Sequence, residues 1–126
     1  MSTHKICVTA EGKDLNASID PRFGRCKYFI FADTETLQFE AIENPSLNST
    51  GGAGIQAGQL MSAQGVKAVL TGNVGPNGHQ VLSAAGIEVF TGVSGTVKEA
   101  IENHKLGKYK PAVSPSVGSK FGMPNK

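Results

Sequence analysis

The sequence predicts one α/β domain whose mixed sheet is antiparallel in its first half and parallel in its second. Strand-like runs joined by short polar turns fill residues 5–44, and from residue 53 onward helix-like and strand-like segments alternate. Alternation at this spacing implies parallel strands with right-handed crossovers. The length of 126 residues suits a single domain with a modest core.

Three strands are expected in the first half. The segment "KICVTA" (5–10) is a short β-branched run ended by a polar turn, and residues 28–31 form an aromatic run that favours a strand. Residues 36–44 alternate apolar and polar side chains, with Ile42 as the exception. The intervening "DTET" (33–36) is typical of a hairpin turn, so this half is predicted to be an antiparallel meander.

The second half opens with a polar loop, a glycine cluster and a predicted helix, for which Gly65 suits the C-terminal cap. One stripe of this helix is apolar and comprises Ala53, Ala57, Leu60 and Met61. Strands are expected within residues 66–72 and 87–92, on either side of a second helix.

That second helix is expected within residues 75–86, because Pro76 suits its first turn and a glycine follows its end. A third helix, within residues 96–107, opens with the capping pair Thr96 and Glu99. With three helices covering the sheet, the domain is assigned to residues 1–110. Residues 111–126 have no periodicity and are predicted to form a flexible C-terminal tail.

The composition limits the class of protein. Hydrophobic residues make up 39% of the chain and charged residues 17%, which is typical of a globular domain. A formal net charge of +2 is too small to indicate a nucleic-acid or membrane surface. The chain has no apolar run of bilayer length and no secretory signal at its start, so a cytoplasmic protein with two reduced cysteines is expected.

Glycine-rich junctions suggest a binding site. Two of them, "STGGAG" (49–54) and "TGNVGPNG" (71–78), stand before predicted helices, and "DPRFGRC" (20–26) adds two arginines. Glycines let main-chain N–H groups approach a ligand, and a helix N-terminus carries unpaired donors and partial positive charge, so an anion site is predicted. The same glycines also suit tight turns alone. The candidate residues are Arg22, Phe23, Gly24, Arg25, Gly51, Gly52, Ala53, Gly54, Asn73, Gly75, Pro76 and Asn77.

The segments "DPRFGR", "GGAGIQAGQLM", "VLTGNVGPNGHQVLSAAGIEVF" and "VKEAI" together resemble the dinitrogenase iron–molybdenum cofactor biosynthesis family. The resemblance covers residues 5–106 in order and with compatible spacing. It implies a ribonuclease H-like fold and a noncatalytic role in binding, storing or delivering an iron–sulfur, iron–molybdenum or molybdenum-containing cluster. Cluster-assembly or recipient proteins are the partners that it implies.

Two side chains are candidate metal ligands. Cys26 follows the arginines, whose charges are expected to lower the pKa of its thiol and favour the thiolate. A small buried residue at the start of a strand is the alternative. His79 lies in the first turn of the second predicted helix, where its ring could reach a cluster atom or stay exposed.

Two other classes of function compete with a cluster carrier. Ribonuclease H-type chemistry needs carboxylates that converge on magnesium, and "KICVTA" contains none, so a nuclease is rejected. No catalytic constellation stands out, and the protein is not expected to be an enzyme. A metal-free module for a small anion or a protein partner remains the alternative, because glycine-rich helix starts accept any anion. The oligomeric state is not predicted.

Overall fold

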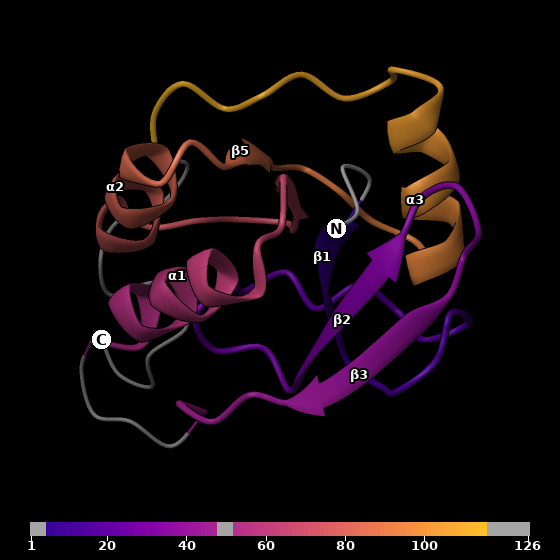
Figure 1. The fold of residues 1–126 in the computed structure, drawn as a ribbon, viewed down its shortest axis with the longest axis horizontal. Helices are drawn as coiled ribbons and strands as arrows, with labels where there is room; N and C mark the ends of the chain where they lie inside the picture. The colour runs from indigo at the N-terminus through magenta and orange to yellow at the C-terminus, as the bar shows by residue number, and fades with distance from the viewer. Residues whose placement is uncertain (1–4, 48–51, 116–126) are drawn as a thin grey trace.

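The computed structural model describes residues 5–47 and 52–115. Its five strands form one sheet in the order β3-β2-β1-β4-β5 (Figure 1). The strands are β1 (Lys5–Ala10), β2 (Tyr28–Asp33), β3 (Phe39–Glu43), β4 (Ala68–Leu70) and β5 (Glu88–Phe90). The helices are α1 (Ala53–Gln64), α2 (Pro76–Ala84) and α3 (Val97–Lys105).

The strand pairing confirms the predicted mixed sheet. β1 pairs antiparallel with β2, and β2 with β3, whereas β1 pairs parallel with β4, and β4 with β5. The "DTET" segment makes the expected hairpin turn: the Leu37 amide donates to the Asp33 carbonyl at 2.8 Å, and Leu37 adopts a φ of 62°. The arrangement is the predicted ribonuclease H-like α/β domain.

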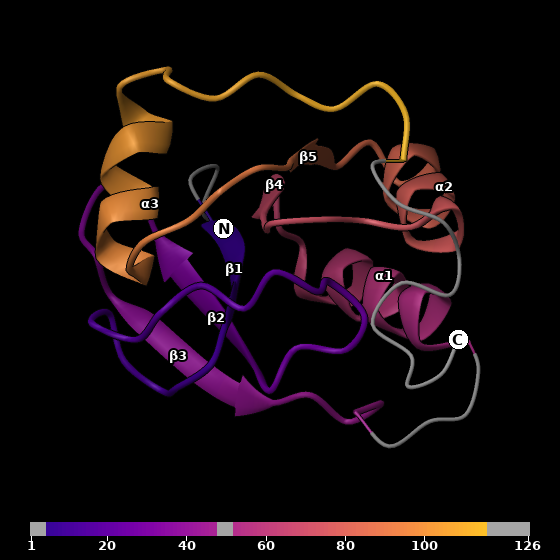
Figure 2. The ribbon, with the colours of Figure 1, turned by 180° about the vertical axis from the view of Figure 1, so that it is seen from behind.

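Side chains that alternate along the strands build one core on each face of the sheet. On β1, Ile6 and Val8 join the core beneath α3, whereas Cys7 joins the core beneath α1 and α2. Figures 1 and 2 show α1 and α2 side by side, well separated from α3. Ile42, the exception in the predicted alternation, packs against the core beneath α1 and α2, while its neighbour Ala41 packs against the other. Both faces of β3 are therefore partly covered.

The helix ends follow their predicted signals. Gly65 closes α1 in the left-handed conformation, with a φ of 70°. Thr96 and Glu99 form a complete capping box at the start of α3, in which each side chain accepts the other's main-chain N–H. Pro76 begins α2. None of the described helices is long and apolar enough to cross a membrane.

The segment after α3 returns along the outer side of β5 and reaches α2 (Figure 1). Pro111 forms an antiparallel bridge with Phe90, and the Ala112 amide donates to the Val89 carbonyl at 2.7 Å. Residues 111 and 112 are thus tied to the sheet, although they fall in the predicted flexible tail. Residues 116–126 of that tail lie outside the described residues, so their flexibility stays a prediction.

Candidate functional site

The candidate site lies where the parallel strands β1 and β4 end. Val8 of β1 is in register with Leu70 of β4, so both carboxyl ends face the same edge of the sheet. Just beyond that register, the hydroxyls of Thr9 and Thr71 are hydrogen-bonded at 2.8 Å, and both residues are fully buried. Crevices beyond the carboxyl ends of parallel strands are where α/β sheets bind ligands.

The loop 20–26, called the arginine loop because it contains Arg22 and Arg25, runs alongside the loop between β4 and α2. The Asn73 amide donates to the Pro21 carbonyl at 2.7 Å, and the Phe23 amide donates to the Asn73 carbonyl at 3.3 Å. Gly72 permits this approach, because a Cβ on Gly72 would lie 2.7 Å from the Pro21 Cα. Two loops about 50 residues apart in the chain are therefore joined by main-chain hydrogen bonds and lie side by side.

Three glycines bring these paired loops into contact with the starts of α1 and α2. A Cβ on Gly24 would lie 2.9 Å from the amide nitrogen of Gly54, in the first turn of α1. A Cβ on Gly54 would lie 3.1 Å from the amide nitrogen of Gly78, in the first turn of α2, and one on Gly78 would lie 3.1 Å from the Phe23 ring. The contact of Gly24 excludes a side chain, and those of Gly54 and Gly78 leave little room for one. The glycines therefore bring main chain against main chain, and the two helix starts meet at the arginine loop.

The starts of α1 and α2 differ from the start of α3 in how their main-chain donors are capped. Gly52 and Gly75 are the N-cap residues, neither offers a side-chain acceptor, and neither helix has an acidic residue in its first turn. In α3, by contrast, Glu99 lies in the first turn and completes the capping box. The first turns of α1 and α2 are thus suited to an external anion, because their N–H groups and helix dipoles point toward it.

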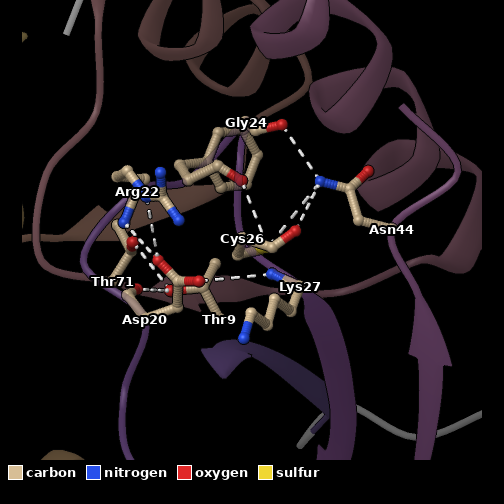
Figure 3. A network of polar contacts seen from close by, with 9 residues as sticks. Thr9, Asp20, Arg22, Gly24, Cys26, Lys27, Asn44 and Thr71 are labelled. Atoms are coloured by element: carbon tan, nitrogen blue, oxygen red, sulfur yellow. Dashed lines mark hydrogen bonds and ion pairs between the residues drawn. The ribbon is translucent and has the colours of Figure 1, made fainter. Parts of the chain in front are cut away.

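A buried carboxylate organises the arginine loop (Figure 3). Asp20 is 1% exposed, and its Oδ1 accepts from the Arg22 amide at 3.1 Å and lies 3.4 Å from Arg22 Nε. The Lys27 amide donates to its Oδ2 at 3.2 Å. The main chain of Asp20 is also bound to Thr9, whose carbonyl accepts the Asp20 amide at 3.0 Å and whose hydroxyl donates to the Asp20 carbonyl at 2.6 Å. The start of the loop is held by five contacts.

The end of the loop is held from the other side by Asn44, the residue after β3 (Figure 3). Its side-chain nitrogen donates to the carbonyls of Gly24 at 3.0 Å and Cys26 at 2.9 Å. Its side-chain oxygen accepts from the Ser46 amide at 2.9 Å. Because Asn44 is buried, these bonds replace its contacts with water and fix the carbonyls of the loop.

The predicted lowering of the Cys26 pKa is wrong. Burial raises the pKa of this thiol, and the nearby Cys7 and Asp20 raise it further, against the smaller opposing effect of Arg22. The thiol is 0% exposed and donates to the Phe23 carbonyl at 3.4 Å. The prediction counted the arginine charges but not the position of the sulfur inside the core, where desolvation disfavours the thiolate.

His79 is turned toward the C-terminal segment. Its Nε2 lies 3.1 Å from the Ala112 carbonyl oxygen, and because a carbonyl only accepts, the ring donates. Within residues 5–47 and 52–115, no three His, Cys, Asp or Glu side chains are grouped so that they could hold a metal ion. A metal ligand role for Cys26 or His79 stays a prediction.

The remaining candidates divide by exposure. Phe23 is 3% exposed and packs against Phe29 at 6.1 Å between ring centroids, so it anchors the loop from inside. Ala53 is buried. The partly or fully exposed candidates are Arg22, Gly24, Arg25, Gly52, Gly54, Asn73, Gly75, Pro76 and Asn77. Gly51 lies outside the described residues.

Sequence reasoning missed the residues that hold the loop. Asp20 stands in the quoted segment "DPRFGR", directly before Pro21, and such a carboxylate commonly accepts the amide two residues later. That local bond was therefore predictable. The bonds from Asn44 to the loop, and from Thr9 to Thr71, join residues 18 or more positions apart, and no local pattern indicates them.

Comparisons with known proteins show relatives of this chain in sequence and in fold. A family model described as dinitrogenase iron-molybdenum cofactor matches residues 4–107. The apo form of the orange protein from Desulfovibrio gigas is 38% identical, with a TM-score of 0.88 over 93% of this chain and 100% of that one. A candidate NifB protein from Thermotoga is 33% identical, with a TM-score of 0.77 over 90% and 97%. An uncharacterized protein of Methanocaldococcus jannaschii is 31% identical over 96 residues, which are 74% of this chain and 81% of that protein.

Proposed function

Because this chain belongs to the dinitrogenase iron–molybdenum cofactor family, we propose that it binds an anionic metal–sulfur cluster for storage or delivery, without catalysing a reaction. The cargo would be an iron–sulfur, iron–molybdenum or molybdenum-containing cluster. One observation carries the proposal: the first turns of α1 and α2 meet at a loop with two arginines, through Gly24, Gly54 and Gly78.

The donors at this junction suit an anion held by hydrogen bonds. Main-chain N–H groups of the two first turns and the guanidinium groups of Arg22 and Arg25 would bind the sulfide or oxo groups of a cluster. Cys26, the last residue of the loop, is buried in the core. A noncovalent site therefore agrees with the donor set better than one built on thiolate ligands.

Whether Cys26 or His79 is a metal ligand can be tested, and two observations speak against both. The Cys26 thiol is 0% exposed, and the His79 ring already donates to Ala112. If Cys26→Ala and His79→Ala both bind the cluster with unchanged affinity and an unchanged visible spectrum, neither side chain is a ligand. A changed spectrum in either variant would identify a ligand.

A protein with this role would act in the cytoplasm and meet cluster-assembly or recipient proteins, and it would need neither nucleic acid nor membrane. The net charge of +2 agrees with this, because it is too small to drive binding to either polyanion.

The proposed function is tested by reconstitution without oxygen. The protein is exposed either to tetrathiomolybdate or to iron with sulfide, then freed of excess reagent and analysed for metal, sulfide and visible absorption. Retained, coloured cluster in a defined ratio to protein supports the proposal. Protein that stays colourless with both reagents would refute it and favour the metal-free module for a small anion or a protein partner.

The arginines are tested by removing both. Arg22→Ala combined with Arg25→Ala should weaken binding roughly 10- to 100-fold, because charge-assisted hydrogen bonds to the anion are lost. The matched control, Lys105→Ala with Lys108→Ala, removes the same charge at the far end of α3 and should change affinity less than about twofold. Equal losses in both double variants would mean that only net charge matters.

A further inference from the structure

We propose that Asp20 is a positioning residue of this anion site, which fixes the Arg22 guanidinium by its Nε and leaves the two terminal nitrogens for the anion. The inference rests on the proposed function. It assigns a role to a carboxylate, a group that would by itself repel the cargo.

Asp20 is suited to positioning because it cannot move easily. Its carboxylate is buried, and both oxygens accept main-chain N–H groups, from Arg22 and from Lys27. Its own main chain is bound to Thr9, at the end of β1. Because both its main chain and its carboxylate are held, Asp20 has a fixed position relative to the sheet and can fix the position of the Arg22 guanidinium. It also loses little further entropy when ligand binds.

Arg22 contacts this carboxylate with the inner nitrogen of its guanidinium. Nε lies 3.4 Å from Asp20 Oδ1, and the side chain is 37% exposed, against 2% for Asp20. Within residues 5–47 and 52–115, the terminal nitrogens of Arg22 have no hydrogen-bond partner. An arginine restrained at Nε keeps its terminal donors free in a defined plane, which is the arrangement that favours recognition of a multi-oxygen or multi-sulfide anion.

Arg22 is also placed beside both helix starts. It forms a parallel bridge with Asn73, in the loop that leads to α2, and two residues later Gly24 touches the first turn of α1. Restraint of this guanidinium therefore orients it relative to the main-chain donors of the same site.

Charge alone predicts the opposite effect of Asp20. Removing a carboxylate beside an anion site reduces repulsion and should tighten binding. If Asp20 acts by positioning, its removal should weaken binding even though the protein gains positive charge. The two explanations therefore differ in the sign of the effect.

The experiment is an anaerobic titration with tetrathiomolybdate, followed by visible absorption. Asp20→Asn and Arg22→Lys should each bind about tenfold more weakly than the unaltered protein, which corresponds to the loss of one hydrogen bond to a charged group. Arg22→Lys keeps the charge and the main-chain bonds to Asp20, so it serves if Asp20→Asn folds poorly. The matched control is Glu43→Gln, which removes an exposed carboxylate with no bond to Arg22, and it should bind equally or more tightly.

Affinity of Asp20→Asn at or above that of the unaltered protein would overturn the inference, as would unchanged affinity of Arg22→Lys. In either case the proposed function would stand. No binding by the unaltered protein would overturn both together, so the two failures are distinguishable. Thermal unfolding of each variant, measured in parallel, identifies any loss that comes from a destabilised fold.

Discussion

Individual residues around the loop 20–26 act mainly by placing main chain. Asp20 and Asn44 bind amides and carbonyls of the loop, and Gly24 and Gly72 let neighbouring segments approach. Phe23 fills the core beneath them. The residues that shape the site are thus largely different from those that would touch a ligand, and substitutions that alter the shape should act through stability as well as binding.

Gly24→Ala tests the closest main-chain contact. The new Cβ would meet the amide nitrogen of Gly54 at 2.9 Å, a main-chain atom that cannot rotate away. We expect the free energy of unfolding to fall by about 1–3 kcal/mol, as overpacking does elsewhere. Urea denaturation measures it. In the control Gly52→Ala, no atom of the described residues lies within 4 Å of the new Cβ, so the variant reports the cost of a φ of 73°. An equal loss in both variants would argue against a steric cause.

His104 predicts a dependence of stability on pH. Burial lowers the pKa of its ring from 6.5, against a smaller raising effect of Glu88, and the ring packs edge-on to Phe90 with 5.0 Å between centroids. The unfolded chain then takes up the proton first as the pH falls. The contribution of His104 is therefore complete above pH 6.5 and is lost progressively below it, toward the lower pKa of the folded state.

Urea denaturation at pH 7 and pH 5 checks this. The unaltered protein should lose more stability between the two values than His104→Gln, which cannot be protonated there. Identical losses would show that the ring does not contribute.

At the scale of elements, the three helices differ in how they begin. α3 satisfies its first donors internally, through the capping box of Thr96 and Glu99. α1 and α2 begin at Gly52 and Gly75, which offer no side-chain acceptor. This contrast separates a helix whose first donors are satisfied within the fold from two helices whose starts suit the proposed anion site.

Thr96→Ala should therefore destabilise the protein by about 1 kcal/mol, because the Glu99 amide loses its acceptor. Thr96→Ser retains the hydroxyl and should remain close to the unaltered protein. Neither substitution should change tetrathiomolybdate affinity, since α3 covers the other face of the sheet. Thermal unfolding and the titration above measure the two effects.

The elements were largely predictable from sequence, whereas the site was predictable only in part. Period-two alternation, β-branched and aromatic runs, a capping pair, and glycine or proline at helix ends are local signals, and together they placed all eight elements. The glycine junctions indicated where helices begin, but contacts such as Gly54 against Gly78 arise only when the helices pack. The pKa of Cys26 was predicted in the wrong direction because burial is a property of the folded chain.

For the whole molecule, the segment after α3 connects the outer strand to the site. It pairs with β5 through Phe90 and Val89, and Ala112 accepts a hydrogen bond from His79 at the start of α2. Ala112 is thus joined to an element that begins 36 residues earlier.

Truncation tests this connection. A chain that ends at residue 110 loses these contacts and should be less stable, by about 1 kcal/mol, than one that ends at residue 115. In the shorter chain, hydrogen exchange of the β5 amides should also be faster, because the strand becomes a bare edge. Equal stability and equal exchange would mean that the segment contributes nothing to the sheet.

The main-chain contacts among Gly24, Gly54 and Gly78 also divide the molecule by its tolerance to sequence change. Gly24 meets the main chain of Gly54 too closely for a side chain, and Gly54 and Gly78 leave little room for one, whereas Ile55 and Asn77 are exposed and tolerate more change. Under the proposed function, the exposed side chains beside these glycines set the ligand preference while the scaffold stays constant. Positions 55 and 77 are therefore the first to vary in a redesign of that preference.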